Sequence, residues 1–223
     1  MGSGGYRALL LDLDGTLAQT DSLPPPTRAT VLKPHGIEVD EALYRERISG
    51  RSNAKIAKDL VPVLTTEEIQ ALANAKEADF RERAGDLEPL PGLMDFVDSA
   101  RKNGLRLALV TNAPKANVLA VLRALDLEGD FKEIVVADEV GEAKPHPAPY
   151  RAALKRLDIA PEEALAFEDS ISGLASAVGA GIPTVGISST QSPGKLREAG
   201  AFVVAKDFTD LNLRSVVYGD GAP

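Results

Sequence analysis

Two aspartates lie two residues apart near the start of the chain, in the segment YRALLLDLDGTL. The apolar run before Asp12 predicts a buried strand, and Gly15 predicts a turn directly after it. Residues two apart in an extended chain point to the same side, so the carboxylates of Asp12 and Asp14 are expected to face one small volume. Two like charges in such a volume need a cation or a proton to compensate them. The pair therefore favours a divalent metal ion.

Two simpler interpretations of this segment are a calcium-binding loop and an acidic turn. In an EF-hand loop that starts at Asp12, the sixth position requires a glycine and the twelfth a bidentate glutamate. This chain has Leu17 and Leu23 at those positions, which excludes the calcium loop. From this segment alone, an acidic turn that only closes a strand remains a second interpretation.

Further residues that could act on a charged substrate lie where three other predicted strands end. Thr111 and Asn112 close the predicted strand at residues 105–111, and Glu168 and Asp169 close the one at 164–168. Lys144 lies in the loop after the predicted strand at residues 133–137. Because the carboxyl ends of parallel strands meet at one edge of a sheet, we expect these residues to converge near Asp12. Taken singly, a strand-end threonine, a loop lysine and an acidic pair before a helix are each more typical of ordinary structure. Their occurrence at successive strand ends favours a single site.

The segment DLDGTL at residues 12–17 resembles the first motif of the haloacid dehalogenase (HAD) superfamily. The strand-end residues described above resemble the second, third and fourth motifs of that family, in the same order. The match extends to KPHPAPY at residues 144–150 and to FEDSISGLASAVGAGIP at residues 167–183. The resemblance implies a phosphatase in which Asp12 is the nucleophile and Asp14 is the general acid and base.

The resemblance also implies a magnesium site and a phosphate site. Its metal ligands would be the carboxylates of Asp12 and Asp169 and the backbone carbonyl of Asp14, with Glu168 supporting them from outside the coordination sphere. The phosphate group would be bound by Thr111, Asn112 and Lys144. Such a set suits phosphoryl transfer, which spreads negative charge over several oxygens and needs fixed positive charge and hydrogen-bond donors.

Composition limits the classes of chemistry that are open to this chain. The 223 residues include no cysteine, which excludes disulfides and thiolate chemistry. The two histidines, His35 and His146, are too few for a metal site built from histidines. A metal ion must therefore be bound by oxygen atoms, which favours magnesium.

Charge and hydropathy point to the kind of partner. The formal net charge of −8 argues against nucleic acid, and no apolar run approaches the length of roughly 20 residues that spans a bilayer. No leader with a cleavage site is apparent. We expect a cytoplasmic enzyme, a monomer or weak dimer, that acts on a small phosphorylated metabolite and binds neither nucleic acid nor a membrane.

From residue 91 onward, amphipathic helical stretches alternate with short apolar runs. Leu93, Phe96 and Val97, for example, form a helical stripe that is followed by the strand-like run LRLALVT. This order predicts parallel strands joined by right-handed crossovers, an α/β Rossmann-like sheet. For the helix over residues 170–179, the expected buried face consists of Ile171, Leu174, Ala175 and Val178.

Residues 20–87 differ from the rest of the chain. The polar and proline-rich stretch AQTDSLPPP at residues 18–26 leads into this segment, and three consecutive prolines cannot continue a helix or a central strand. Short amphipathic stretches follow, without β-branched runs. We therefore predict a small all-helical cap domain over residues 20–87, inserted after the first strand of a catalytic core formed by residues 1–19 and 88–223.

Such a cap resembles that of the phosphoglycolate phosphatase and β-phosphoglucomutase branch, where it selects the leaving group. Members of this branch often have a histidine twelve residues after the nucleophile, and this chain has Pro24 there. The mutase places an arginine in its cap where this chain has Asn53, with Arg51 nearby. Both departures favour a hydrolase, and Arg51 and Asn53 are the candidate specificity residues of the cap.

Three functions fit these motifs. The first is a magnesium-dependent phosphatase that hydrolyses a small phosphate ester, such as phosphoglycolate or a sugar phosphate, through an aspartyl-phosphate. The second is a β-phosphoglucomutase-type phosphosugar mutase. The third is a non-catalytic protein that binds a phosphorylated ligand, and Asp14 argues against it because a binding protein has no use for a general acid.

Overall fold

The computed structural model describes residues 5–20, 36, 59, 67, 74, 77, 78 and 80–219. The chain divides into two compact units, Met1–Thr20 with Glu88–Pro223, and Asp21–Leu87. In the second unit the described residues 80–83 are helical and are followed by the 3-10 helix η3 (Ala84–Asp86). Most of the predicted cap, with Pro24, Arg51 and Asn53, lies outside the described residues, so the all-helical cap stays a prediction.

In the described part of the first unit, six parallel strands form one sheet in the order β3-β2-β1-β4-β5-β6. The strands are β1 (Ala8–Leu11), β2 (Arg106–Thr111), β3 (Phe131–Val136), β4 (Ala164–Glu168), β5 (Thr184–Ile187) and β6 (Val203–Ala205). All four residues of β1 are fully buried, which is typical of a central parallel strand that is covered on both faces.

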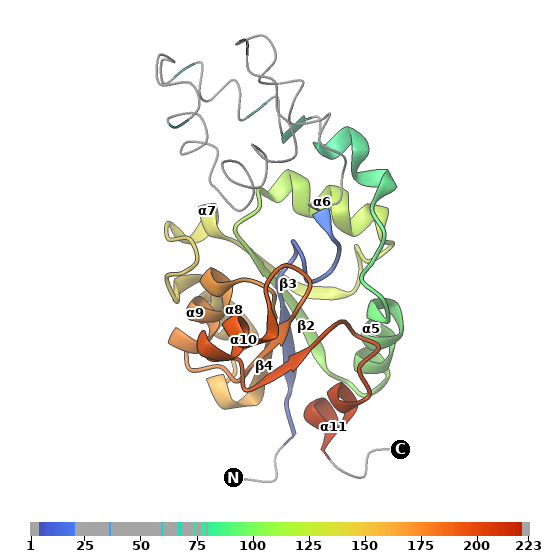
Figure 1. Ribbon diagram of the computed structural model, residues 1–223, viewed down its shortest axis with the longest axis vertical. Coiled ribbons are helices and arrows are strands. Elements are labelled where there is room, and N and C mark those ends of the chain that lie inside the picture. The colour runs from blue at the N-terminus through green and yellow to red at the C-terminus, as the bar shows by residue number, and fades with distance from the viewer. Residues whose placement is uncertain are drawn as a thin grey trace. The chain divides into compact units, whose positions relative to one another are not determined.

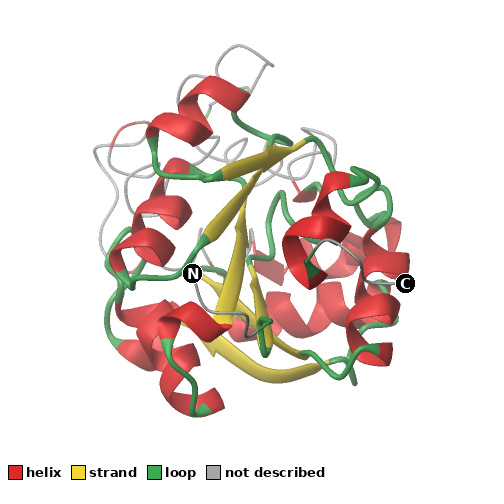
Figure 2. Ribbon diagram, turned by 90° about the horizontal axis from the view of Figure 1, so that it is seen from below, coloured by secondary structure: helices red, strands yellow, loops and turns green. Residues whose placement is uncertain are grey.

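Helices follow the strands and cover both faces of the sheet. They are α5 (Leu93–Lys102), α6 (Lys115–Ala124), α7 (Ala137–Val140), α8 (Ala148–Leu157), α9 (Ile171–Gly179), α10 (Pro193–Glu198), α11 (Asn212–Tyr218) and the 3-10 helix η4 (Pro161–Glu163). Helices α8, α9 and α10 lie on one side of the sheet and α5 and α11 on the other (Figure 1). The view turned by 90° shows helices on both sides of the strands (Figure 2). The predicted α/β Rossmann-like fold is confirmed.

The two faces of the sheet have different packing. On one face, small residues of the central strands pack against larger side chains of α8, among them Tyr150 and Leu157. On the other face, the rings of Phe96, Phe167 and Phe208 form a cluster with centroids 4.8 to 5.8 Å apart. Phe96 belongs to the predicted helical stripe of α5, which is buried as expected.

The predicted buried face of α9 is confirmed for Leu174 and wrong for Ile171, Ala175 and Val178. Ile171 and Val178 are exposed, and the residues that α9 buries are Gly173, Leu174, Ser176 and Ala177. A Cβ on Gly173 would lie 1.8 Å from the Glu168 carboxylate, so the helix approaches the end of β4 closely. Such an approach requires a residue without a side chain at position 173, and hydrophobic periodicity does not indicate this requirement.

Among the described residues, no helix has both the length and the apolar character needed to cross a membrane. The cytoplasmic location stays a prediction of the sequence.

Candidate active site

The strand order places a candidate site where β1 and β4 end. After β1 the chain crosses to β2 on one side, whereas after β4 it crosses to β5 on the other side. Leu11 pairs with Phe167 of β4, and the backbone N–H of Asp12 donates to the Phe167 carbonyl at 3.1 Å. Asp12 therefore lies beside Glu168 at the point where the order of strands reverses, which is where open α/β sheets bind ligands.

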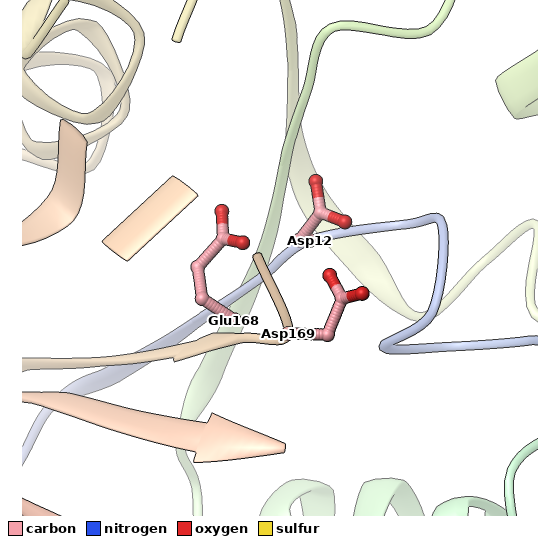
Figure 3. A group of neighbouring side chains, drawn as sticks. All are labelled: Asp12, Glu168 and Asp169. Atoms are coloured by element: carbon pink, nitrogen blue, oxygen red, sulfur yellow. The ribbon is translucent and has the colours of Figure 1, made fainter. Parts of the chain in front are cut away.

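Three carboxylates meet at this point. One carboxylate oxygen each from Asp12, Glu168 and Asp169 lies within 4.8 Å of the others, and all three residues are buried. Figure 3 shows the three side chains projecting to the same side of the two chain segments that bear them. The structure thus brings together Asp12 and Asp169, as expected. The Glu168 carboxylate, at the end of β4, belongs to the same group.

Lys144 lies beside this group and is almost fully buried. Its Nζ donates to Asp12 Oδ1 at 2.5 Å, to Glu168 Oε1 at 2.6 Å and to the Val110 carbonyl at 2.6 Å. Burial alone would lower the pKa of Lys144. The charges of Asp12 and Glu168, with their hydrogen bonds, outweigh burial and raise the pKa above its ordinary value. Lys144 therefore keeps its positive charge at neutral pH.

The side chain of Asn112 fixes the loop that bears Lys144. Asn112 Nδ2 donates to the Lys144 carbonyl at 3.2 Å, and the Lys144 backbone N–H donates to Asn112 Oδ1 at 2.9 Å. Two reciprocal hydrogen bonds hold the loop after β3 and α7 against the end of β2. Thr111, the last residue of β2, is also buried, and its hydroxyl accepts from the Ala113 N–H at 3.0 Å. A hydroxyl that accepts in this way still has its own proton to donate.

Asp14 has a different environment from the other three acids. It is exposed, and its Oδ1 accepts a hydrogen bond from the Thr20 hydroxyl at 2.6 Å. Its carboxylate is not one of the three that meet. The carboxylates that meet are therefore those of Asp12, Glu168 and Asp169. They include the Asp12 and Asp169 pair that the motif resemblance implied, but not the Asp14 carboxylate that strand spacing alone had placed beside Asp12.

Gly15 brings the turn after Asp14 against Asp169. Its φ of +76° lies in the left-handed region, which favours glycine, and its N–H donates to the Ala18 carbonyl at 2.8 Å. A Cβ at this position would lie 2.2 Å from Asp169 Oδ2. Only a residue without a side chain fits here.

Three residues that the sequence did not single out contact the site. The Tyr150 hydroxyl donates to Glu168 Oε1 at 2.7 Å, and Tyr150 is fully buried. The Thr190 hydroxyl donates to the Asp169 carboxylate, and Ser189 Oγ donates to the Gly15 carbonyl at 2.5 Å. Ser189 and Thr190 lie in the loop after β5, and this position was the available signal, because Asp12, Thr111 and Asp169 also lie where strands end. Tyr150 lies within α8, where no such signal existed.

The site holds more negative charge than its lysine compensates. Burial, followed by the Asp12 charge, raises the pKa of Asp169 to about 8, against the hydrogen bond from Thr190. Burial also raises the pKa of Glu168 to about 7, although Lys144 acts in the opposite direction. Both carboxyls therefore bind protons more tightly than exposed acids do.

A hard divalent cation fits this group. Three carboxylates and one ammonium leave two formal negative charges, and the donors are carboxylate oxygens, which magnesium prefers. Both oxygens of Glu168 accept hydrogen bonds, Oε1 from Lys144 and Tyr150 and Oε2 from the Ser170 hydroxyl at 3.4 Å. Asp12 and Asp169 accept theirs through one oxygen each, so these two carboxylates are better placed to contact a cation.

Comparisons with known proteins agree with this site. A family model of haloacid dehalogenase-like hydrolases matches residues 6–181. Protein CbbY of Rhodobacter capsulatus is 36% identical over 201 residues, which cover 80% of this chain and 84% of the relative. A phosphorylated carbohydrates phosphatase of Thermotoga maritima is 33% identical over 213 residues, which cover 93% of this chain and 97% of the relative.

A crystal structure has the same fold. A CbbY variant from Rhodobacter sphaeroides in complex with xylulose bisphosphate has a TM-score of 0.79 and 30% identity, covering 92% of this chain and 96% of that one. The chain therefore belongs to the haloacid dehalogenase-like hydrolases. It is an enzyme, a phosphomonoester hydrolase of this family, and the resemblance seen in its motifs is confirmed.

Proposed function

We propose that this enzyme is a magnesium-dependent phosphatase that hydrolyses a small phosphorylated metabolite through an aspartyl-phosphate. The observation that best supports the proposal is the buried Lys144 ammonium, bonded to Asp12 and Glu168 beside the Asp169 carboxylate. A protonated lysine next to a carboxylate nucleophile offsets the repulsion between that carboxylate and a phosphate dianion.

In the first step, an oxygen of Asp12 attacks phosphorus. The new O–P bond forms as the P–O bond to the leaving alcohol breaks, and Asp14 gives its proton to the leaving oxygen. In the second step, Asp14 takes a proton from a water molecule that attacks phosphorus. Inorganic phosphate leaves and the Asp12 carboxylate is restored. The hydrogen bond from Thr20 fixes the direction of the Asp14 carboxylate.

The phosphate oxygens would be bound by the residues at the end of β2 and by Lys144. Thr111 donates its hydroxyl proton, and Asn112 contributes through its backbone because its side chain holds the Lys144 loop. Thr111 and the Asn112 backbone are positioned before the substrate arrives. The three N–H bonds of the Lys144 ammonium point to Asp12, Glu168 and Val110, so Lys144 acts on the phosphate through its charge or by redirecting one of these bonds.

A magnesium ion would be held by the carboxylates of Asp12 and Asp169 and the backbone carbonyl of Asp14. When bound, it neutralises charge on the transferring phosphoryl group. Glu168 would hold Lys144 from outside the coordination sphere, since Lys144 and Tyr150 already bind its Oε1.

The relatives support a sugar phosphate or a similarly small ester as substrate. The Thermotoga maritima relative is named for phosphorylated carbohydrates, and the CbbY structure holds xylulose bisphosphate. Phosphoglycolate stays a candidate from the motif resemblance. A cytoplasmic location fits a substrate of this kind.

Phosphate release from a panel of esters tests the proposal. The panel contains phosphoglycolate, hexose monophosphates, a pentulose bisphosphate and nucleoside monophosphates, each with and without magnesium, for the wild type and Asp12→Asn. We expect magnesium-dependent release from at least one small ester by the wild type and none by Asp12→Asn. Release that persists in Asp12→Asn, or that is indifferent to chelation of magnesium, would contradict the mechanism.

The other two functions predict different outcomes. A phosphosugar mutase would release little phosphate but would convert β-glucose 1-phosphate once a bisphosphate activator is added. A non-catalytic binding protein would retain an ester without changing it, and Asp12→Asn would leave that binding intact.

A further inference from the structure

The loop after β5 joins two site segments that are far apart in the sequence. Ser189 Oγ donates to the carbonyl of Gly15, in the turn after β1. The Thr190 hydroxyl contacts both the carboxylate and the backbone carbonyl of Asp169, which follows β4. Ser189 thus holds the turn that contains Asp14, and its neighbour Thr190 holds the Asp169 carboxylate.

We propose that Thr190 is a positioning residue that orients the Asp169 carboxylate for the metal ion, an inference that rests on the proposed function. The motif resemblance includes no residue after β5, and the contact is visible only in the structure.

The geometry restricts one oxygen of the carboxylate. Asp169 Oδ2 accepts the Thr190 hydroxyl, and a Cβ on Gly15 would lie 2.2 Å from the same atom. The backbone of Gly15 and the side chain of Thr190 therefore both lie against Asp169 Oδ2 and limit its movement. A carboxylate held through one oxygen keeps its second oxygen for a cation, and its rotation is limited.

Thr190 is exposed, whereas Asp169 is only 4% exposed. Removal of the Thr190 hydroxyl therefore opens no cavity in the core, and the fold should tolerate it. Its effect should be a change in the orientation of the buried Asp169 carboxylate. Partners that orient a metal-binding carboxylate from outside typically contribute about 10-fold to 100-fold to metal affinity or activity.

The test compares two threonines of nearly the same segment. Thr190→Val removes the hydroxyl and keeps the shape, Thr190→Ala removes it in a second way, and Thr190→Ser keeps it. Thr184→Val is the matched control, because Thr184 lies at the start of β5 and its hydroxyl donates to the Ile182 carbonyl at 2.9 Å. For each full-length protein, calorimetric titration gives the magnesium dissociation constant and thermal unfolding without metal reports the fold.

We expect Thr190→Val and Thr190→Ala to bind magnesium at least about 10-fold more weakly than the wild type. Thr190→Ser should bind like the wild type, and Thr184→Val should lose stability but not affinity. In phosphate release, Thr190→Val should need more magnesium for half-saturation and should approach the wild-type kcat at saturating metal.

Three results would contradict the inference, on two separate grounds. Equal magnesium affinity of Thr190→Val and the wild type would overturn the role of Thr190 and leave the proposed function standing, as would a Thr190→Ser variant as weak as Thr190→Val. A wild type that binds no magnesium would overturn the proposed metal dependence and this inference with it.

Discussion

The Lys144 ammonium has acceptors from the ends of three strands. Asp12 follows β1, the Val110 carbonyl belongs to β2, and Glu168 ends β4. All of these contacts are buried, so loss of one partner would leave a charge without compensation in a region of low dielectric. Tyr150 extends the same network by donating to Glu168.

Tyr150→Phe isolates that last hydrogen bond. We expect it to lower the free energy of unfolding by about 1.5 to 3 kcal/mol, because the hydroxyl donates to a buried, ionisable carboxyl. Tyr218→Phe is the matched control, since the Tyr218 hydroxyl pairs with the neutral Ser99 hydroxyl at 3.0 Å and should contribute only about 0.5 to 1.5 kcal/mol.

Urea unfolding of the metal-free proteins at one pH above about 8, where Glu168 is ionised, measures both values. Equal effects of the two substitutions would show that the charge of Glu168 adds nothing to the hydrogen bond from Tyr150.

Most of the side chains that meet in the candidate active site could be predicted from their residue types and from their positions at the ends of predicted strands. Acids and a lysine after apolar runs are unusual, so Asp12, Lys144, Glu168 and Asp169 could be expected to converge, and the structure brings them together. Their catalytic roles stay predictions. A contact from Thr190 could not be predicted in the same way, because a threonine in a polar loop has many ordinary explanations.

At the scale of elements, the turn after β1 and the helix after β4 are both shaped by glycine. Gly15 lies against the Asp169 carboxylate and Gly173 of α9 against the Glu168 carboxylate. Each glycine lets one element approach a buried acid more closely than any side chain would allow. The error in the predicted face of α9 has this cause, because hydrophobic periodicity does not register a requirement for small size.

Gly15→Ala tests the close approach. We expect magnesium affinity and phosphate release to fall at least about 10-fold, because a Cβ must displace the Asp169 carboxylate. The control is Gly104→Ala, which has a similar positive φ of +73° but no atom within 4 Å of the position that its new methyl group would take. It should lose about 1 to 2 kcal/mol of stability from backbone strain alone and keep its affinity for magnesium.

Calorimetry and phosphate release on both variants separate strain from displacement. If Gly104→Ala weakened magnesium binding as much as Gly15→Ala, backbone strain rather than the contact with Asp169 would be the cause.

At the scale of the whole molecule, the parallel sheet was predictable, whereas the order of its strands and some helices were not predicted. Alternating apolar runs and amphipathic stretches indicate parallel strands joined by crossovers, and the six strands are parallel. The short helices α7, α10 and α11 were not predicted. They have only 4 to 7 residues, too few for a periodic pattern, and they form because they pack against a sheet that is already specified.

The charge of the site predicts how stability and metal binding vary with pH. The folded, metal-free protein holds protons on Glu168 and Asp169 up to pH values of about 7 and about 8, whereas an unfolded chain releases them near its ordinary values of about 4. Between about pH 5 and about 8 the folded state therefore binds more protons, and the free energy of unfolding should fall as pH rises.

Magnesium must displace the proton of its proposed ligand Asp169, so its affinity should rise as pH increases toward about 8, by up to about 10-fold per pH unit. Urea unfolding and calorimetry at several pH values, with and without magnesium, measure both trends. Stability of the metal-free protein that rises from about pH 5 to about 8 would contradict the raised pKa values.

The most direct test of the account is the location of the phosphoryl group during turnover. The wild type is mixed with a substrate ester and magnesium, quenched rapidly in acid, digested and analysed by peptide mass spectrometry, with Asp12→Asn as the blank. We predict phosphate on Asp12 in the wild type and none on the same peptide of the variant. Turnover without phosphate on Asp12, or with phosphate on another residue, would contradict the assignment of Asp12 as nucleophile.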